Sequence, residues 1–138
     1  MKVLYTAEAV ATGDGRNGKV MTSDGLLTAQ LAVPVEMGGP GGATNPEQLF
    51  AAGYSARFHN ALRLVARRAK ADVTGSEVTA RVGIGPDGSG GYGLSVELLV
   101  SLPGVEPELA DTLVEQAHQV CPYSNATRGN IEVTLTVR

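Results

Sequence analysis

The long helix that organises this chain begins in the segment TNPEQLFAAGYSA, residues 44–56. Asn45 is a good helix cap, because its side-chain oxygen can accept a backbone N–H of the first turn. Pro46 suits the first helical position, and Glu47 favours the positive end of the helix dipole. The sequence therefore predicts a helix from residue 46 to about residue 70, with Gly53 as a candidate bend.

Strand patterns lie on the N-terminal side of this helix. Residues 3–11 and 20–33 are predicted as strands, with a turn at Ser23-Asp24-Gly25 between shorter pieces of the second. Alternating apolar residues give the second segment a half-buried strand pattern: Leu27, Ala29, Leu31 and Val33.

The C-terminal side repeats strand and helix patterns. Two strands are predicted at 78–84 and 94–100, joined by a hairpin loop at Gly85–Gly91. A second helix starts at Pro107 and ends before Pro122, because a residue that precedes proline is pushed out of helical geometry. Its predicted buried stripe is Leu109, Leu113, Ala117 and Val120. A turn at Ser124–Thr127 leads to a last strand, whose inward residues are Ile131, Val133, Leu135 and Val137.

The order βββ-α-ββ-α-β lacks the regular alternation of a parallel sheet. It indicates an α+β fold with mainly antiparallel sheets packed on two helices. The length of 138 residues fits one domain over residues 1–138.

Composition excludes several classes of protein. A net charge of −3 argues against a general nucleic-acid binder, and no apolar run is long enough for a membrane span. The first residues lack an apolar signal-peptide core, so we expect a cytosolic protein. The single cysteine, Cys121, excludes an intrachain disulfide and any zinc site with more than one thiolate.

Glycine-rich segments match nucleotide-binding motifs only superficially. Residues 13–18 and 83–88 both fit G-x-G-x-x-G, but neither is followed at once by a helix, so both are interpreted as hairpin loops. The loop Gly38–Gly42 precedes a helix but lacks the Gly-Lys-Ser/Thr of a phosphate-binding loop.

Few residues are candidates for chemistry. Cys121 follows an apolar stripe at a helix C-terminus, where the dipole disfavours a thiolate, and a buried structural thiol is its simplest interpretation. His118 stands three residues earlier. Arg16 and Glu47 are interpreted from the residues alone as a loop charge and a helix-start residue.

Arg57 falls within an apolar stripe of the first helix, formed by Phe50, Gly53, Ala61, Leu64 and Val65. A buried guanidinium needs a carboxylate or water. Three alternatives stay open. The side chain reaches solvent along the helix, it pairs with an acid such as Glu47, or it occupies a position that holds another residue in related proteins. Ten helical residues span about 15 Å, so pairing with Glu47 would need a bend or a second chain.

Two long blocks resemble the organic hydroperoxide resistance (Ohr) branch of the OsmC/Ohr family. They are residues 44–56, TNPEQLFAAGYSA, and residues 120–131, VCPYSNATRGNI. The start at residues 3–7, VLYTA, and the loop Gly38–Gly42 are also similar to Ohr proteins. The resemblance covers the whole chain in order.

This resemblance implies an intertwined homodimer in which sheets wrap two central helices. It implies that a peroxidatic cysteine is oxidised by an organic hydroperoxide, that a resolving cysteine closes a disulfide, and that a lipoylated protein or another dithiol reduces it. No metal, haem, flavin or nicotinamide is implied. Cys121 matches the resolving cysteine, Arg16 the arginine that stabilises the peroxidatic thiolate, and Glu47 the carboxylate that orients that arginine.

The chain departs from the family at one position. Family members have cysteine after Gly53-Tyr54-Ser55-Ala56, and this chain has Arg57. Arginine cannot form a sulfenic acid. Two hypotheses follow: a hydroperoxide reductase scaffold disabled at its first cysteine, or a non-catalytic module that binds an apolar or anionic ligand.

Overall fold

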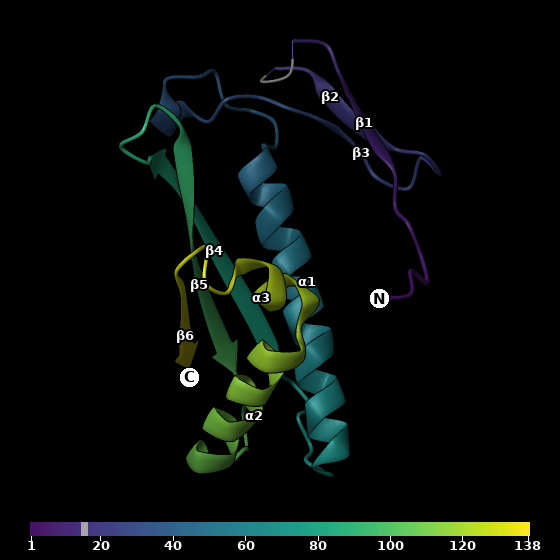
Figure 1. Cartoon of the computed structure of the whole chain (residues 1–138), viewed down its shortest axis with the longest axis vertical. Coiled ribbons are helices and arrows are strands. Elements are labelled where there is room, and N and C mark those ends of the chain that lie inside the picture. The colour runs from purple at the N-terminus through teal and green to yellow at the C-terminus, as the bar shows by residue number, and fades with distance from the viewer. Residues whose placement is uncertain (15–16) are drawn as a thin grey trace. The chain divides into compact units, whose positions relative to one another are not determined.

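The computed structural model describes residues 1–14 and 17–138 (Figure 1). The predicted site residue Arg16 therefore lies outside the described residues. The chain divides into two compact units, Met1–Leu49 and Phe50–Arg138, and each is described by itself below. The prediction of one domain over residues 1–138 stays a prediction.

The N-terminal unit contains a small antiparallel sheet of order β1-β2-β3. Its strands are β1 (Ala9–Thr12), β2 (Lys19–Thr22) and β3 (Thr28–Gln30). A short 3-10 helix, η1 (Val35–Met37), follows and ends at Gly38, whose φ of 83° suits glycine.

The predicted N-terminal strands are shorter in the structure. Residues 3–8 are not a strand, because β2 has four residues and all of them pair with Ala9–Thr12. The predicted strand at 20–33 is two strands, separated by the predicted turn. Asp24 stabilises that turn by accepting hydrogen bonds from the Leu26 backbone N–H and the Thr22 hydroxyl. These bonds hold the pKa of the Asp24 carboxyl below its usual value.

Helix α1 (Pro46–Arg68) confirms the predicted start and length of the first helix. The Gln48 backbone N–H donates to Asn45 Oδ1 at 2.9 Å, which is the predicted cap. The apolar face of α1 belongs to the second unit and buries six residues: Tyr54, Phe58, Ala61, Leu62, Val65 and Ala66.

The second unit contains a sheet of order β4-β5-β6. Strands β4 (Glu77–Pro86) and β5 (Tyr92–Ser101) form the predicted antiparallel hairpin, and β6 (Val133–Val137) adds to β5 in parallel. The glycine-rich motif at 83–88 enters this hairpin turn, as predicted. Asp87 closes the turn by accepting the backbone N–H and hydroxyl of Ser89, and these bonds hold the pKa of its carboxyl below the usual value.

Two helices connect β5 to β6. Helix α2 (Pro107–Val120) has the predicted bounds, but its stripe is rotated from the predicted one. Leu113 and Ala117 are buried as expected, whereas Leu109 and Val120 are exposed, and Ala110 and Val114 complete the buried face instead. The predicted turn at Ser124–Thr127 is wrong in detail: these residues belong to helix α3 (Pro122–Thr127), because Pro122 occupies a first-turn position and starts a new helix.

The core of the second unit lies between one face of the sheet and the helices. Val96, Leu98 and Val100 of β5 alternate on this face and are buried. On β6, the residues that pair with these three are Val133, Leu135 and Val137, which were predicted to face inward. On β4, the paired residues are Val78, Ala80 and Val82. The helices α1 and α2 contribute the rest of this cluster. None of the helices described is long and apolar enough to cross a membrane.

Candidate functional site

Arg57 is exposed, so the prediction that it falls inside a buried stripe is wrong. Each helical residue advances by about 100° around the axis. Arg57 therefore lies about 60° from Tyr54, at the edge of the buried face rather than at its centre. The exposure of Arg57 agrees with the first alternative, in which the side chain reaches solvent, and the third alternative stays a prediction.

Glu47 and Arg57 belong to different units, and their pairing through a second chain stays a prediction. Glu47 lies in the first turn of α1, within the N-terminal unit. The single ion pair among residues 1–14 and 17–138 joins Arg81 and Glu97 across β4 and β5, at 3.0 Å. The roles that the resemblance assigns to Glu47 and Arg16 stay predictions.

Cys121 is fully buried, in agreement with its interpretation as a core thiol. It is the joint between α2 and α3. Its backbone is extended, with ψ of 124°, as expected before Pro122, while its N–H still bonds the Ala117 carbonyl. It belongs to the same core cluster as Tyr54 and Phe58, and Arg57 directly precedes Phe58 on α1.

Helix α3 packs on α1 one turn before Arg57. The Tyr54 ring lies edge-on to Tyr123, with centroids 5.8 Å apart, and edge-on to Phe50 at 6.0 Å. A Cβ at Gly53 would stand 3.3 Å from the Tyr123 ring. The absence of a side chain at Gly53 therefore lets α3 approach α1 closely, which brings the Cys121 joint to the part of α1 that carries Arg57.

A buried hydrogen-bond network lies at the same joint. The Tyr54 hydroxyl lies 2.9 Å from Ser124 Oγ and 3.1 Å from Thr127 Oγ1. His118 Nδ1 lies 2.8 Å from Ser124 Oγ. Arg128 donates from its guanidinium to the His118 carbonyl. Tyr54, Ser124 and Thr127 are buried, and His118 is half-buried.

The surroundings of His118 favour its neutral form. Burial lowers the pKa of the imidazole, the Arg128 charge lowers it further, and Glu115 opposes them. Since the ordinary pKa of histidine is about 6.5, a lowered value leaves the ring uncharged at neutral pH.

The sequence patterns did not identify Tyr54, Ser124 and Thr127 as site residues. A partial signal was present, because Tyr54 stands in the block at 44–56 and the other two stand in the block at 120–131. Nothing in either block indicates that these hydroxyls meet.

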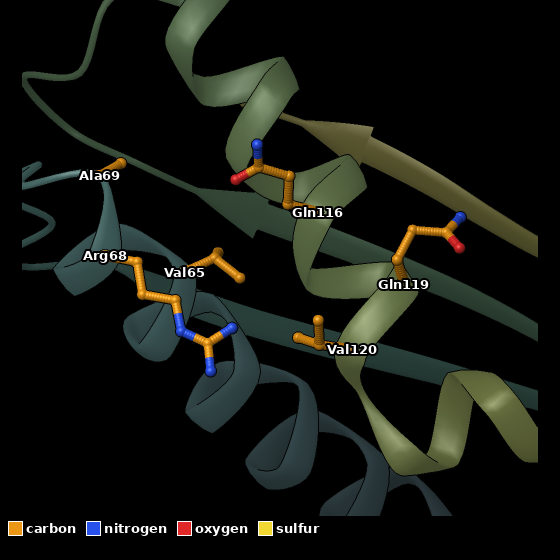
Figure 2. A pocket seen from close by; sticks show the side chains of 6 residues that line it. All are labelled: Val65, Arg68, Ala69, Gln116, Gln119 and Val120. Atoms are coloured by element: carbon orange, nitrogen blue, oxygen red, sulfur yellow. The ribbon is translucent and has the colours of Figure 1, made fainter.

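An open groove of about 420 Å³ lies between the C-terminal half of α1 and α2 (Figure 2). Val65 and Val120 give it an apolar lining, and the Arg68 side chain, which lies across α1 in this view, also borders it. The remaining lining residues are Ala69, Gln116 and Gln119. Glu47, Arg57 and Cys121 are not among the lining residues, but Val120, which directly precedes Cys121, is one of them.

Known proteins share this fold and sequence. The OsmC-like protein family model matches residues 39–136. An organic hydroperoxide resistance protein of Xanthomonas axonopodis pv. citri is 55% identical over 138 residues, which cover 99% of this chain and 96% of that protein.

Solved structures of organic hydroperoxide resistance proteins have the same fold as this chain. The crystal structure of an organic hydroperoxide resistance protein from Legionella pneumophila has a TM-score of 0.94 and 51% identity, and covers 99% of this chain and 98% of that one. The crystal structure of OhrB from Bacillus subtilis has a TM-score of 0.90 and 41% identity, and covers 99% of this chain and 100% of that one. The chain therefore belongs to the OsmC/Ohr family, in its organic hydroperoxide resistance branch.

Proposed function

We propose that this protein is a scaffold for the thiol-dependent reduction of organic hydroperoxides to alcohols, and that Arg57 disables its first step. The role in defence against hydroperoxides follows from its relatives, which are named organic hydroperoxide resistance proteins. The observation that carries the proposal is the position of Arg57. It stands on α1 between Tyr54 and Phe58, both of which share the core cluster with Cys121, the only thiol of the chain.

The chemistry needs a nucleophile at position 57. A thiolate there attacks the distal peroxide oxygen, the O–O bond breaks, and the alcohol leaves after it takes a proton. The sulfenic acid that forms is attacked by the Cys121 thiol, which closes a disulfide and releases water. A lipoylated protein or another dithiol in the cytosol then reduces the disulfide. Arginine offers no sulfur for the first attack, so Cys121 has no sulfenic acid to resolve.

The test is the substitution Arg57→Cys. Coupled to lipoamide and its reductase, this variant should reduce cumene hydroperoxide at least about a thousandfold faster than the unaltered chain, because loss of a covalent nucleophile commonly costs several powers of ten. In the Arg57→Cys background, Arg16→Ala should slow sulfenic acid formation, since a neighbouring cation lowers the pKa of a thiol.

Arg57→Ser is the matched control, because it also removes the guanidinium and leaves a side chain of similar size without a thiol. It should stay inactive. Turnover by the unaltered chain at the rate of Arg57→Cys would refute the proposal, since Cys121 would then act alone. Equal inactivity of both variants would refute it too.

We further propose that the protein is a homodimer. The N-terminal unit exposes several large apolar side chains that a second copy could cover, including Val3, Leu4, Tyr5, Val10, Leu26 and Leu27. A second copy of the chain is the partner that the family resemblance implies. Light scattering after gel filtration should give the mass of two chains, with and without reductant, because Cys121 is buried. The mass of one chain would contradict the proposal.

The second candidate function is binding of an apolar ligand with an anionic end. The groove between α1 and α2 supports it, because two valines line it beside the Arg68 guanidinium (Figure 2). Oleate should displace a fluorescent fatty-acid probe, and Arg68→Gln should weaken this binding while Arg63→Gln, on the same helix but outside the groove, does not. Equal effects of the two substitutions would exclude a specific site.

A further inference from the structure

The four hydrogen bonds around Ser124 can all be made at once in one direction only. The Thr127 hydroxyl donates to the Ser124 carbonyl at 3.2 Å, and a carbonyl can only accept. Because its one proton is used there, Thr127 Oγ1 accepts from the Tyr54 hydroxyl. Tyr54 oxygen then accepts from Ser124, and Ser124 Oγ accepts from His118 Nδ1.

When all four bonds are made, this direction also assigns the tautomer of His118. The neutral imidazole then carries its proton on Nδ1 and leaves Nε2 unprotonated. The chain of donors runs from His118 through Ser124 and Tyr54 to Thr127, and then to the Ser124 carbonyl. None of the buried side-chain nitrogen and oxygen atoms in the described part of the chain lacks a partner, so the network is fully satisfied.

The network ties three elements together at Cys121. His118 lies at the end of α2, Ser124 and Thr127 lie on α3, and Tyr54 lies on α1. Cys121 is the residue between α2 and α3, so both of its flanks are attached to the network. Its thiol makes none of these bonds and is placed by the backbone that they hold.

We propose that Tyr54 is a positioning residue for Cys121: its hydroxyl completes the directional chain that holds the α2–α3 joint on α1 and locks the His118 tautomer. The proposal deepens the proposed function, since Cys121 is there the resolving thiol. Its consequence is that the Tyr54 hydroxyl governs the second chemical step, closure of the disulfide, and leaves the first step unchanged.

The tautomer is measurable in the unaltered chain. Long-range proton–nitrogen correlation spectra of the imidazole rings, in mildly alkaline buffer, should show His118 protonated at Nδ1 only. Tyr54→Phe removes the acceptor of the Ser124 proton, so the His118 signals should move toward a mixture of the two tautomers. The spectrum of His118→Gln assigns the signals. An Nε2-protonated His118 in the unaltered chain would overturn the proposal. This result does not depend on whether any variant folds.

The single cysteine provides a second readout. Cys121 is fully buried, so iodoacetamide reaches it only when the joint opens. Tyr54→Phe should raise the alkylation rate about five- to tenfold, the equivalent of one lost buried hydrogen bond. The matched control is Tyr92→Phe, which removes a hydroxyl from a tyrosine that is 71% exposed on β5 and should leave the rate unchanged. Equal rates for Tyr54→Phe and the unaltered chain would overturn the proposal.

The third readout separates positioning from a general loss of stability. In the Arg57→Cys background, Tyr54→Phe should leave the rate of sulfenic acid formation unchanged and slow disulfide closure about tenfold, the fold-change of one lost hydrogen bond in a buried network. Equal slowing of both steps would show a merely structural role and overturn the proposal. Absence of turnover in Arg57→Cys itself would refute the proposed function only, because the tautomer and alkylation experiments keep Arg57 in place.

Discussion

Two substitutions of the buried Cys121 measure whether its surroundings offer a hydrogen-bond partner. Cys121→Ala removes the sulfur and leaves a small cavity, whereas Cys121→Ser keeps the size and replaces the thiol with a hydroxyl. The thiol is 0% exposed and belongs to the apolar cluster with Tyr54 and Phe58. We expect serine to be the more damaging of the two.

The magnitudes follow from burial. Loss of one buried sulfur costs about 1 kcal/mol of the free energy of unfolding, similar to a buried methylene with its residual cavity. A hydroxyl buried without a partner costs about 1–3 kcal/mol. Cys121→Ser should therefore destabilise the protein by about 2–4 kcal/mol and Cys121→Ala by about 1 kcal/mol.

The assay is urea unfolding of the two variants and the unaltered chain at the same protein concentration. Similar slopes with different midpoints would show that the changes act on stability. Equal stabilities of the serine and alanine variants would refute the reasoning. The hydroxyl would then have a partner, and the Ala117 carbonyl, which the Cys121 N–H already bonds, is the available acceptor.

Two further predictions concern the same joint. Alanine in place of glycine normally stabilises a helix by about 1 kcal/mol. Gly53→Ala should stabilise the protein by less, because its Cβ would stand 3.3 Å from the Tyr123 ring. Urea unfolding should show the full stabilisation only in a Tyr123→Ala background. Because the pKa of His118 is lowered in the folded chain, the unfolded chain binds a proton at this residue more readily. The contribution of neutral His118 to the free energy of unfolding should therefore be present above about pH 6.5 and be lost as the pH falls below it. His118→Gln should remove this part of the pH dependence. A pH dependence unchanged by His118→Gln would contradict this assignment.

Local chemistry made much of the fold predictable. The cap at Asn45, the first-turn proline at Pro46 and the break before Pro122 act within a few residues, so they fix the bounds of α1 and α2 in the sequence itself. The hairpin β4–β5 follows from strict alternation on both sides of a glycine-rich turn. Where local signals were weaker, the predictions were less accurate: residues 3–8 alternate poorly and remain outside the sheet, and Ser124–Thr127 form a helix instead of a turn.

The sequence by itself determined the family, because the blocks at 44–56 and 120–131 are contiguous, and the same blocks predict the position of the missing nucleophile. The tertiary structure decided which face of α1 is buried, and hence that Arg57 is exposed at its edge. It also decided the surroundings of Cys121. Tyr54 and Ser124 stand 70 positions apart, and their hydroxyls meet only because α3 packs over Gly53 on α1. A periodic pattern reports which side of a helix is apolar, whereas the partner of a buried hydroxyl depends on how distant elements pack.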